Sequence, residues 1–388
     1  MGSANRLIEI ALAFPRGAHQ EVFIEGIVRY ATEHDRRWTY IIAPESSSVS
    51  ILQLVGWNGD GVIAALNTAR EAKCAADFPL PVVNMSSALA DSPVPRSMVD
   101  NHAIGVTAAE HLAERGFQSY AFYGMRDVEY SKRRLAGFNE RLALAGFRSL
   151  ELMLPSTFHL RGRVWLQQQQ QLTKWLADLP TPVGIFAASD TRARQVVSAC
   201  AQIGLKVPEQ VAVLGVDDQQ IICEHIRPTL SSVARNNILE GYSAAAILDR
   251  MMRGGKAPRG DQLVLPLQVV ARESTATFAV SDDRLRKVLA YFHEHLEDPV
   301  TVEELCSHAE VSRRWLEYSF QNLLKETPYQ YMRRTRLDLA RRLLTEEPHA
   351  KIYCIAERTG FSSAKQLTKV FRRQFGISPR EYRRTSAS

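Results

Sequence analysis

The chain has 388 residues, 45% of them hydrophobic, which is enough for two or three domains with substantial cores. No apolar run approaches the length of a membrane span, and the N-terminal segment lacks the charged start and long apolar stretch of a signal peptide, so we expect a cytoplasmic protein. The five cysteines form no CxxC pair, and no Cys and His spacing matches a zinc site, so no metal is expected.

The net charge of +6 is concentrated near the C-terminus. Residues 311–388 contain 17 Lys and Arg against 7 Asp and Glu, a surplus of ten positive charges. Such a concentration in one part of the chain indicates a polyanionic partner whose binding is salt-sensitive, and a solvated basic face is the alternative.

From Leu7 onward, short apolar runs alternate with helical patterns. Strands are expected at LIEIALAF, WTYIIAP, GVIAAL, PVVNM, YAFYG, VGIFAA and VAVLGV, and helices at residues 20–32, 105–115, 133–145, 164–176 and 193–203. This alternation predicts a mostly parallel α/β fold with helices on both faces of the sheet, and its two successive sets predict two lobes. Ligands of such folds bind at the carboxyl ends of the strands.

Charged residues stand at those strand ends. Asp217 follows VAVLGV, Asp190 follows VGIFAAS, Asp100 follows Met98-Val99, and Arg134 opens the helix after YAFYG. Carboxylates accept hydrogen bonds and a guanidinium donates them, so such residues in one place are typical of a pocket for a small polar ligand.

Other residues near these strand ends have open interpretations. Asp190 has an alternative role as the N-cap of the helix that starts near Arg192. Phe14 and His19, after the first strand, are candidates for the opposite wall of the pocket, although a phenylalanine that ends a strand is more often a core residue.

The stretches VDN with Gly105, RGF at 115–117, Gly137-Phe138, Ser189-Asp190, GVDD at 215–218 and VAREST at 270–275 resemble the ligand-sensing domain of the LacI/GalR repressors. The resemblance implies a two-lobed, type I periplasmic-binding-protein-like fold over residues 6–275, followed by a linker at 276–281. It also implies that Asp217, Arg134, Asp100 and Ser189 face the effector. Leu7 already starts the first strand, so the DNA-binding headpiece of that family is expected to be replaced by another module.

Residues 352–384 predict a helix, a tight turn and a second helix. Gly360 suits a turn that needs a positive φ, Ser362 is the expected N-cap of the second helix, and Gly376 is expected to end it. A similar unit starts at residue 302, with a turn around Glu310-Val311 and Ser312 as a candidate N-cap.

The motifs IxxIA, GFS, VFRRxFGISP and EYRR resemble the AraC-family DNA-binding domain. The resemblance implies an all-α domain at residues 282–388 with two helix-turn-helix units, at about 302–324 and about 352–375. Outward side chains of the second helix in each unit enter the major groove. The base-reading candidates are Arg313, Arg314, Glu317, Tyr318, Ser363, Lys365, Gln366 and Lys369, and the phosphate-contacting candidates are Arg372 and Arg373.

The combination of the two domains resembles the bacterial xylose-operon activators. The resemblance implies a homodimer that binds D-xylose, binds promoter DNA and acts on RNA polymerase. The alternatives are the same architecture tuned to another pentose or small sugar, and a sugar-binding module that acts through protein partners. An enzyme is not expected, because GxSxG, GxxxxGK[ST] and HExxH are all absent from the sequence, and no cofactor is expected.

Overall fold

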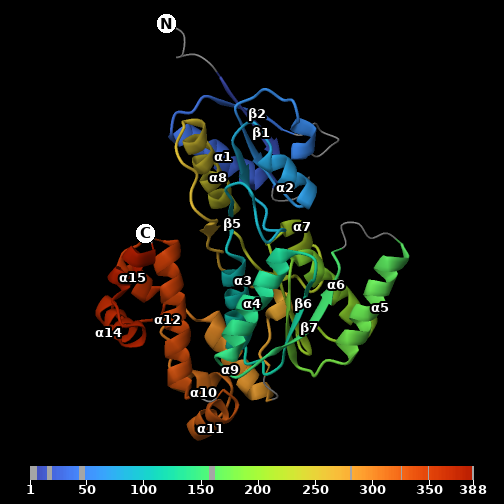
Figure 1. Ribbon diagram of the computed structural model, residues 1–388. Helices are drawn as coiled ribbons and strands as arrows, with labels where there is room; N and C mark the ends of the chain where they lie inside the picture. The colour runs from blue at the N-terminus through green and yellow to red at the C-terminus, as the bar shows by residue number, and fades with distance from the viewer. Residues whose placement is uncertain are drawn as a thin grey trace.

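Two α/β lobes stand one above the other, with a helical domain beside the lower lobe (Figure 1). This computed structural model describes residues 7–14, 20–42, 49–156, 162–279, 282–324, 326–347 and 349–386. We call the upper lobe, which contains the first strand, the N-lobe and the lower lobe the C-lobe.

The N-lobe is built on a parallel four-stranded sheet in the order β2-β1-β3-β4, formed by Trp38–Ile41, Ile8–Ala13, Gly61–Ala64 and Val82–Asn84. Helices α1 (Gln20–Glu33) and α8 (Asn237–Met252) cover one face, while α2 (Ala69–Ala76) and the 3-10 turn η1 (Ile51–Leu54) cover the other. Helices α1 and α8 approach so closely that a Cβ on Gly26 would lie 2.0 Å from the Ile238 carbonyl oxygen. The absence of a side chain at Gly26 permits this contact.

The C-lobe contains a six-stranded sheet in the order β12-β10-β9-β8-β6-β7. Its strands are Val269–Val270, Ser231–Val233, Val211–Val216, Val183–Ala187, Tyr120–Met125 and Ser149–Leu154, all parallel except β12. Helices α3 (Asn101–Glu114) and α4 (Glu129–Ala143) cover one face, and α5 (Arg163–Ala177) and α6 (Asp190–Gln202) cover the other. The predicted α/β architecture is therefore confirmed.

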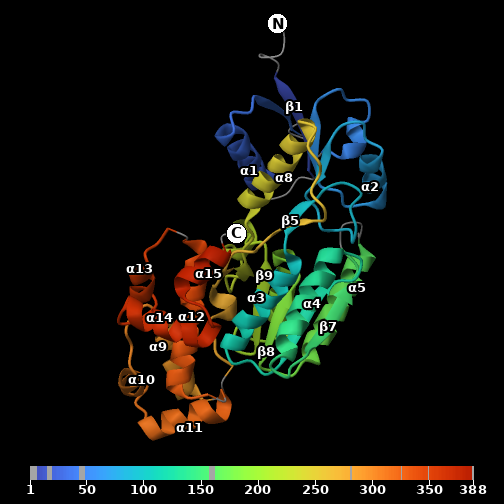
Figure 2. The ribbon, with the colours of Figure 1, turned by 60° about the vertical axis from the view of Figure 1, so that its left-hand side comes forward.

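The chain crosses between the lobes three times. The first crossing runs through β5 (Ser97–Val99), the second joins β10 to α8, and the third runs through β11 (Gln262–Val264) to β12. Strands β5 and β11 pair in parallel between the lobes (Figure 2). Any motion of one lobe against the other must therefore be absorbed by these three segments.

The helical domain has two apolar cores. Its elements are α9 (Asp283–Glu294), α10 (Val302–His308), α11 (Arg313–Leu323), α12 (Pro328–Glu346), α13 (Ile352–Glu357), α14 (Ala364–Phe375) and α15 (Pro379–Ser386). The first core lies among α9, α10, α11 and the start of α12, and the second among the rest of α12 and α13 to α15. The domain is all-α and contains the two expected helix-turn-helix units.

Three details of the sequence-based expectations need correction. The helix expected at residues 133–145 spans Glu129–Ala143, so Arg134 lies in its second turn and does not open it. The helix expected at residues 105–115 begins at Asn101, because Asp100 caps it through the N–H groups of His102 and Ala103. The N-cap of α14 is Ser363, not Ser362, because the Ser363 hydroxyl accepts from the Gln366 N–H. No helix within the described residues is both long and apolar enough to cross a membrane.

Candidate functional site

A cluster of charged side chains lies at the carboxyl ends of the C-lobe strands, on the side that faces the N-lobe. Arg134 comes from α4 after β6, Asp217 follows β9, and Arg235 follows β10. Asp217 lies between the two arginines, with Oδ1 at 3.7 Å from Arg134 Nη2 and 3.4 Å from Arg235 Nη1. We call Asn101, Arg134, Asp190, Asp217, Arg235 and Glu240 the pocket cluster.

The backbone of Asp217 is held in an unfavourable conformation. Its φ is +105°, and that of Asp218 is +50°, a region that non-glycine residues rarely adopt. Such a conformation costs on the order of 1–3 kcal/mol and persists where the surrounding structure imposes it, which is common at binding sites. Asp218 itself is paired with Arg272 at 2.7 Å, which indicates a structural role for it.

Arg134 is buried and held on several sides. Its Nε donates to Asn101 Oδ1 at 2.9 Å, its Nη1 donates to the Ala188 carbonyl oxygen, and its guanidinium lies 4.9 Å from the Tyr130 ring centroid. Burial lowers the pKa of Arg134, and the nearby Asp217 carboxylate opposes that shift. The guanidinium is thus fixed in orientation, as a side chain that positions a ligand must be.

Asp190, in the first turn of α6, is fully buried. Its carboxylate accepts from Ser232 Oγ at 2.6 Å and from the Gln219 N–H at 2.8 Å. Burial, followed by the charge of Asp217, raises the pKa of Asp190 to about 7. The alternative N-cap role is wrong, because Ser189 caps α6 through the Arg192 N–H and Asp190 stands in the first turn.

Arg235 and Glu240 were missed at the sequence level. Arg235 Nη2 lies 2.7 Å from Glu240 Oε2, and the same oxygen accepts the Val99 N–H at 3.0 Å. Burial alone would lower the pKa of Arg235, but Glu240 and Asp217 outweigh it and raise the pKa. Arg235 stands two residues after β10, so the strand-end position that pointed to Asp217 could have found it if a strand had been expected at residues 231–233.

The remaining candidates lie apart from this cluster or make other contacts. Phe14 is 3% exposed in the N-lobe core, with its ring centroid 6.1 Å from that of Phe23. The guanidinium of Arg235 lies 5.7 Å from the Phe23 ring, so Phe23, not Phe14, meets the pocket cluster. Asp100 and Ser189 both use a side-chain oxygen as a helix cap. His19 lies outside the described residues.

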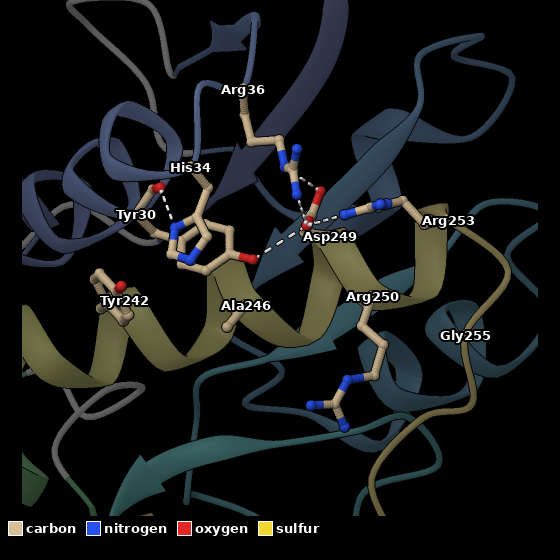
Figure 3. A pocket seen from close by; sticks show the side chains of 9 residues that line it. All are labelled: Tyr30, His34, Arg36, Tyr242, Ala246, Asp249, Arg250, Arg253 and Gly255. Atoms are coloured by element: carbon tan, nitrogen blue, oxygen red, sulfur yellow. Dashed lines mark hydrogen bonds and ion pairs between the residues drawn. The ribbon is translucent and has the colours of Figure 1, made fainter.

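A surface hollow of about 550 Å³ lies elsewhere, between the C-terminal parts of α1 and α8 (Figure 3). At its centre, Asp249 accepts from Tyr30 Oη at 3.1 Å and pairs with Arg36 at 2.9 Å and Arg253 at 3.8 Å. The hollow is not lined by the pocket cluster. Among the described residues, no three His, Cys, Asp or Glu side chains form a group that could hold a metal ion.

The second helix of the first helix-turn-helix unit, α11, presents one polar face to solvent. The Ser312 hydroxyl caps α11 by accepting the Trp315 N–H at 3.2 Å, while Leu316 and Phe320 are buried. The exposed face carries all four candidates of this unit: Arg313, Arg314, Glu317 and Tyr318. Arg313 is paired there with Glu303 at 2.6 Å and with Glu317 at 3.0 Å.

The second unit repeats this geometry in α14. Leu367 and Phe371 are buried, and the candidates Ser363, Lys365, Gln366, Lys369, Arg372 and Arg373 are exposed. Gly360 in the turn has the expected positive φ, +65°, and Gly376 at the C-cap has +76°.

Arg336 of α12 connects the two units. A Cβ on Gly360 would lie 2.5 Å from Arg336 Nε, and Arg336 Nη2 donates to the Asp298 carbonyl oxygen at 2.6 Å, in the loop before α10. Leu296 adds an apolar contact to both cores. The turn of the second unit therefore contacts a side chain that is also bonded to the loop before the first unit.

A two-lobed α/β domain with a charged cluster at its strand ends, followed by two helix-turn-helix units with exposed second helices, defines a DNA-binding transcription regulator with a sensing domain. Family models agree with this class: residues 109–275 match a periplasmic binding protein-like domain, and residues 305–385 match a helix-turn-helix domain. The chain therefore joins a periplasmic binding protein-like domain to a C-terminal helix-turn-helix domain.

Similar proteins share both domains. The chain is 29% identical to the xylose operon regulatory protein of Escherichia coli K12 over 373 residues, which is 94% of each chain. It is 26% identical to the xylose operon regulatory protein of Haemophilus influenzae over 384 residues, covering 97% of this chain and 98% of that protein. A solved structure of the xylose-binding transcription activator xylR matches with a TM-score of 0.63 and 27% identity, covering 98% of both chains.

Proposed function

We propose that this regulator binds a sugar in its sensing domain, with D-xylose as the favoured effector, and binds promoter DNA in response. The observation that carries the proposal is the placement of Asp217 between Arg134 and Arg235 at the strand ends. Whole-length similarity to proteins described as xylose regulators supports D-xylose over other small sugars.

The pocket cluster offers the groups that a sugar needs. The Asp217 carboxylate accepts from two adjacent hydroxyls, and the guanidinium groups of Arg134 and Arg235 donate to sugar oxygens. Arg235 lies on a crossing segment and Glu240 on α8 of the N-lobe, whereas Arg134 and Asp217 belong to the C-lobe. A sugar that contacts both sets binds the closed arrangement of the lobes better than an open one, and this difference in affinity shifts the population.

In this proposal the DNA-binding domain recognises the promoter through its two helix-turn-helix units. In our proposal Arg313, Arg314 and Glu317 read bases in one stretch of major groove, while Lys365, Gln366 and Lys369 read a second stretch. Arg372 and Arg373 contact phosphates. We further propose that the chain acts in the cytoplasm as a homodimer on duplicated sites, activates transcription through RNA polymerase, and carries no enzymatic activity or cofactor.

The test is a titration of the purified full chain into a duplex that it selects from a random library, with and without D-xylose. We expect D-xylose to strengthen specific binding several-fold, and calorimetry to show heat with D-xylose that is lost in Asp217→Ala. Parallel calorimetry with L-arabinose, D-ribose and D-glucose ranks the alternative effectors. Failure to select any specific duplex would refute gene regulation and favour a sugar-binding module that acts through protein partners.

A further inference from the structure

Helix α3 begins at the pocket cluster and ends at the DNA-binding domain. Its 14 residues span about 21 Å at 1.5 Å per residue. In its first turn the buried Asn101 accepts from Arg134 Nε at 2.9 Å and donates through Nδ2 to Ser87 Oγ at 3.0 Å. Ser87 lies on the first crossing segment between β4 and β5. The first turn therefore contacts both the rest of the pocket cluster and a segment that joins the two lobes.

The middle of α3 is locked against α4. A Cβ on Gly105 would lie 2.1 Å from the Arg134 carbonyl oxygen, and a Cβ on Gly137 would lie 2.0 Å from the His102 carbonyl oxygen. The two helix backbones are thus in direct contact around the residues that reach the pocket cluster. Because packed interiors are dense and transmit strain, a displacement of Arg134 is carried into α3.

The last turn of α3 meets α12 of the DNA-binding domain. The buried Tyr331 donates its hydroxyl to the Glu114 carbonyl oxygen at 3.1 Å and contacts His293 Nε2 at 2.8 Å. Burial, then the charges of Arg115 and Arg334, lowers the pKa of His293 to about 3, so its ring is neutral at physiological pH and Nε2 can donate to Tyr331.

A second contact lies one turn earlier. The Glu110 carboxylate pairs with Arg341 of α12 at 3.7 Å and with Arg141 of α4 at 3.2 Å. The linker is held at the same end, because the Ala279 N–H donates to the Arg115 carbonyl oxygen at 2.8 Å. Figure 1 shows α12 beside the C-lobe face that α3 and α4 cover. The C-terminal half of α3 is thus a docking surface for the DNA-binding domain.

We propose that α3 is the mechanical link through which sugar binding repositions the DNA-binding domain, with Glu110, Glu114, Tyr331 and Arg341 as its output contacts. This proposal rests on the proposed function. A sugar that binds Arg134 changes the hydrogen bond between Arg134 and Asn101, and α3 then shifts together with α4. Helix α12 follows because Tyr331 and Arg341 contact Glu114 and Glu110 of α3. Energetic coupling of this kind is reciprocal, so the sugar strengthens DNA binding by the factor by which DNA strengthens sugar binding.

The experiment compares coupling ratios, defined as the DNA dissociation constant without D-xylose divided by that at saturating D-xylose. The double variant Glu110→Gln with Tyr331→Phe removes the carboxylate and the hydroxyl but keeps the side-chain shapes. We expect its ratio to fall to within about twofold of 1, from a wild-type ratio in the usual range of roughly 5 to 150. The melting temperature is expected to fall, because Tyr331→Phe removes the hydroxyl partner of the Glu114 carbonyl and of His293. Affinity for D-xylose without DNA should stay close to wild type, so a loss of the ratio alone separates a link from general damage to the fold.

The matched control is Arg358→Gln. It removes an arginine that pairs with Glu347 at 2.8 Å within the DNA-binding domain, and it should keep the wild-type ratio. A wild-type ratio above 5 that persists in the double variant overturns the α3 link alone, whereas a wild-type ratio of 1 overturns the proposed function as well. If the double variant does not fold, Glu110→Gln alone is compared with wild type. We expect its coupling ratio to fall at least threefold. An unchanged coupling ratio would overturn the α3 link.

Discussion

The pocket cluster and the outer faces of α11 and α14, which we call the DNA-binding face, both contain many charged side chains. These side chains are buried in the pocket cluster and exposed on the DNA-binding face. Around Asp217 the charged groups are buried and mutually compensated, so each is held by its partners. On α11 and α14 the cations are exposed, and the ion pairs of Arg313 with Glu303 and Glu317 lie at the surface. The first region is therefore held in place by contacts within the protein, whereas the second leaves its charged groups accessible, as our proposal of a preorganised sugar site and a DNA-contacting face requires.

The largest expected effect comes from breaking the compensation in the pocket cluster. Asp217→Ala leaves Arg134 and Arg235 facing one another without the carboxylate between them. Removal of one partner from a buried ion pair costs roughly 3–5 kcal/mol, so urea unfolding should show a loss of this order together with loss of sugar binding. Asp218→Asn, at the neighbouring and more exposed pair with Arg272, is the control and should cost less. A loss below about 1 kcal/mol in Asp217→Ala would mean that the cluster is not mutually compensated.

On the DNA-binding face a comparable truncation should leave folding unchanged and alter recognition. Arg314→Ala is expected to cost roughly 1–3 kcal/mol of specific DNA affinity and to relax the base preference at one position, measured on a panel of single-base variants of the selected duplex. Arg373→Ala should instead weaken binding to all sequences and reduce the salt slope by about 1. Uniform weakening by Arg314→Ala would reassign Arg314 to a phosphate contact.

A pH titration sharpens the contrast. The folded pKa of Asp190 is about 7, above its ordinary value of 3.8, so the folded chain binds more protons than the unfolded chain between these values. Stability should therefore fall as pH rises through this window, by on the order of 1 kcal/mol per pH unit for this group. Glu114, whose pKa burial raises to about 7, adds a slope of the same sign. Asp190→Asn should flatten the slope between pH 5 and 7 in thermal unfolding, and an unchanged slope would exclude Asp190 as its source.

The smallest expected effect is at an exposed ion pair. Arg313→Gln breaks contacts with Glu303 and Glu317, all three side chains being more than half exposed. Exposed pairs contribute roughly 0.2–1 kcal/mol, so the melting temperature should change little while affinity for the selected duplex falls. A large loss of stability would show that charges on this face also support the fold.

The sequence predicted the residues whose position follows from fold rules. Asp217, Asp190 and Arg134 follow strands, and the carboxyl ends of parallel strands converge, so their proximity could be inferred. Arg235 and Glu240 come from a crossing segment and the start of α8, and Glu240 meets Val99 across 141 positions of sequence, a pairing that no local pattern carries.

Two adjacent serines show where local rules become ambiguous. Ser362 and Ser363 are both good N-caps, and the structure selects Ser363 because the Ser362 N–H and hydroxyl bind Gln366 Oε1 instead. The docking of α12 on α3 was also beyond the sequence, since Tyr331 fits the apolar stripe of its own domain equally well.

The contact of Arg336 with the Gly360 turn has a consequence for the DNA that the regulator accepts. One side chain, that of Arg336, contacts both the turn of the second unit and the loop before the first. We therefore expect the two units to keep a fixed distance and orientation relative to each other when they bind DNA. Each base pair inserted between the two stretches they read would rotate one by about 34° relative to the other, at 10 to 10.5 base pairs per turn. The operator should therefore tolerate many changes of base between the stretches but almost none of spacing.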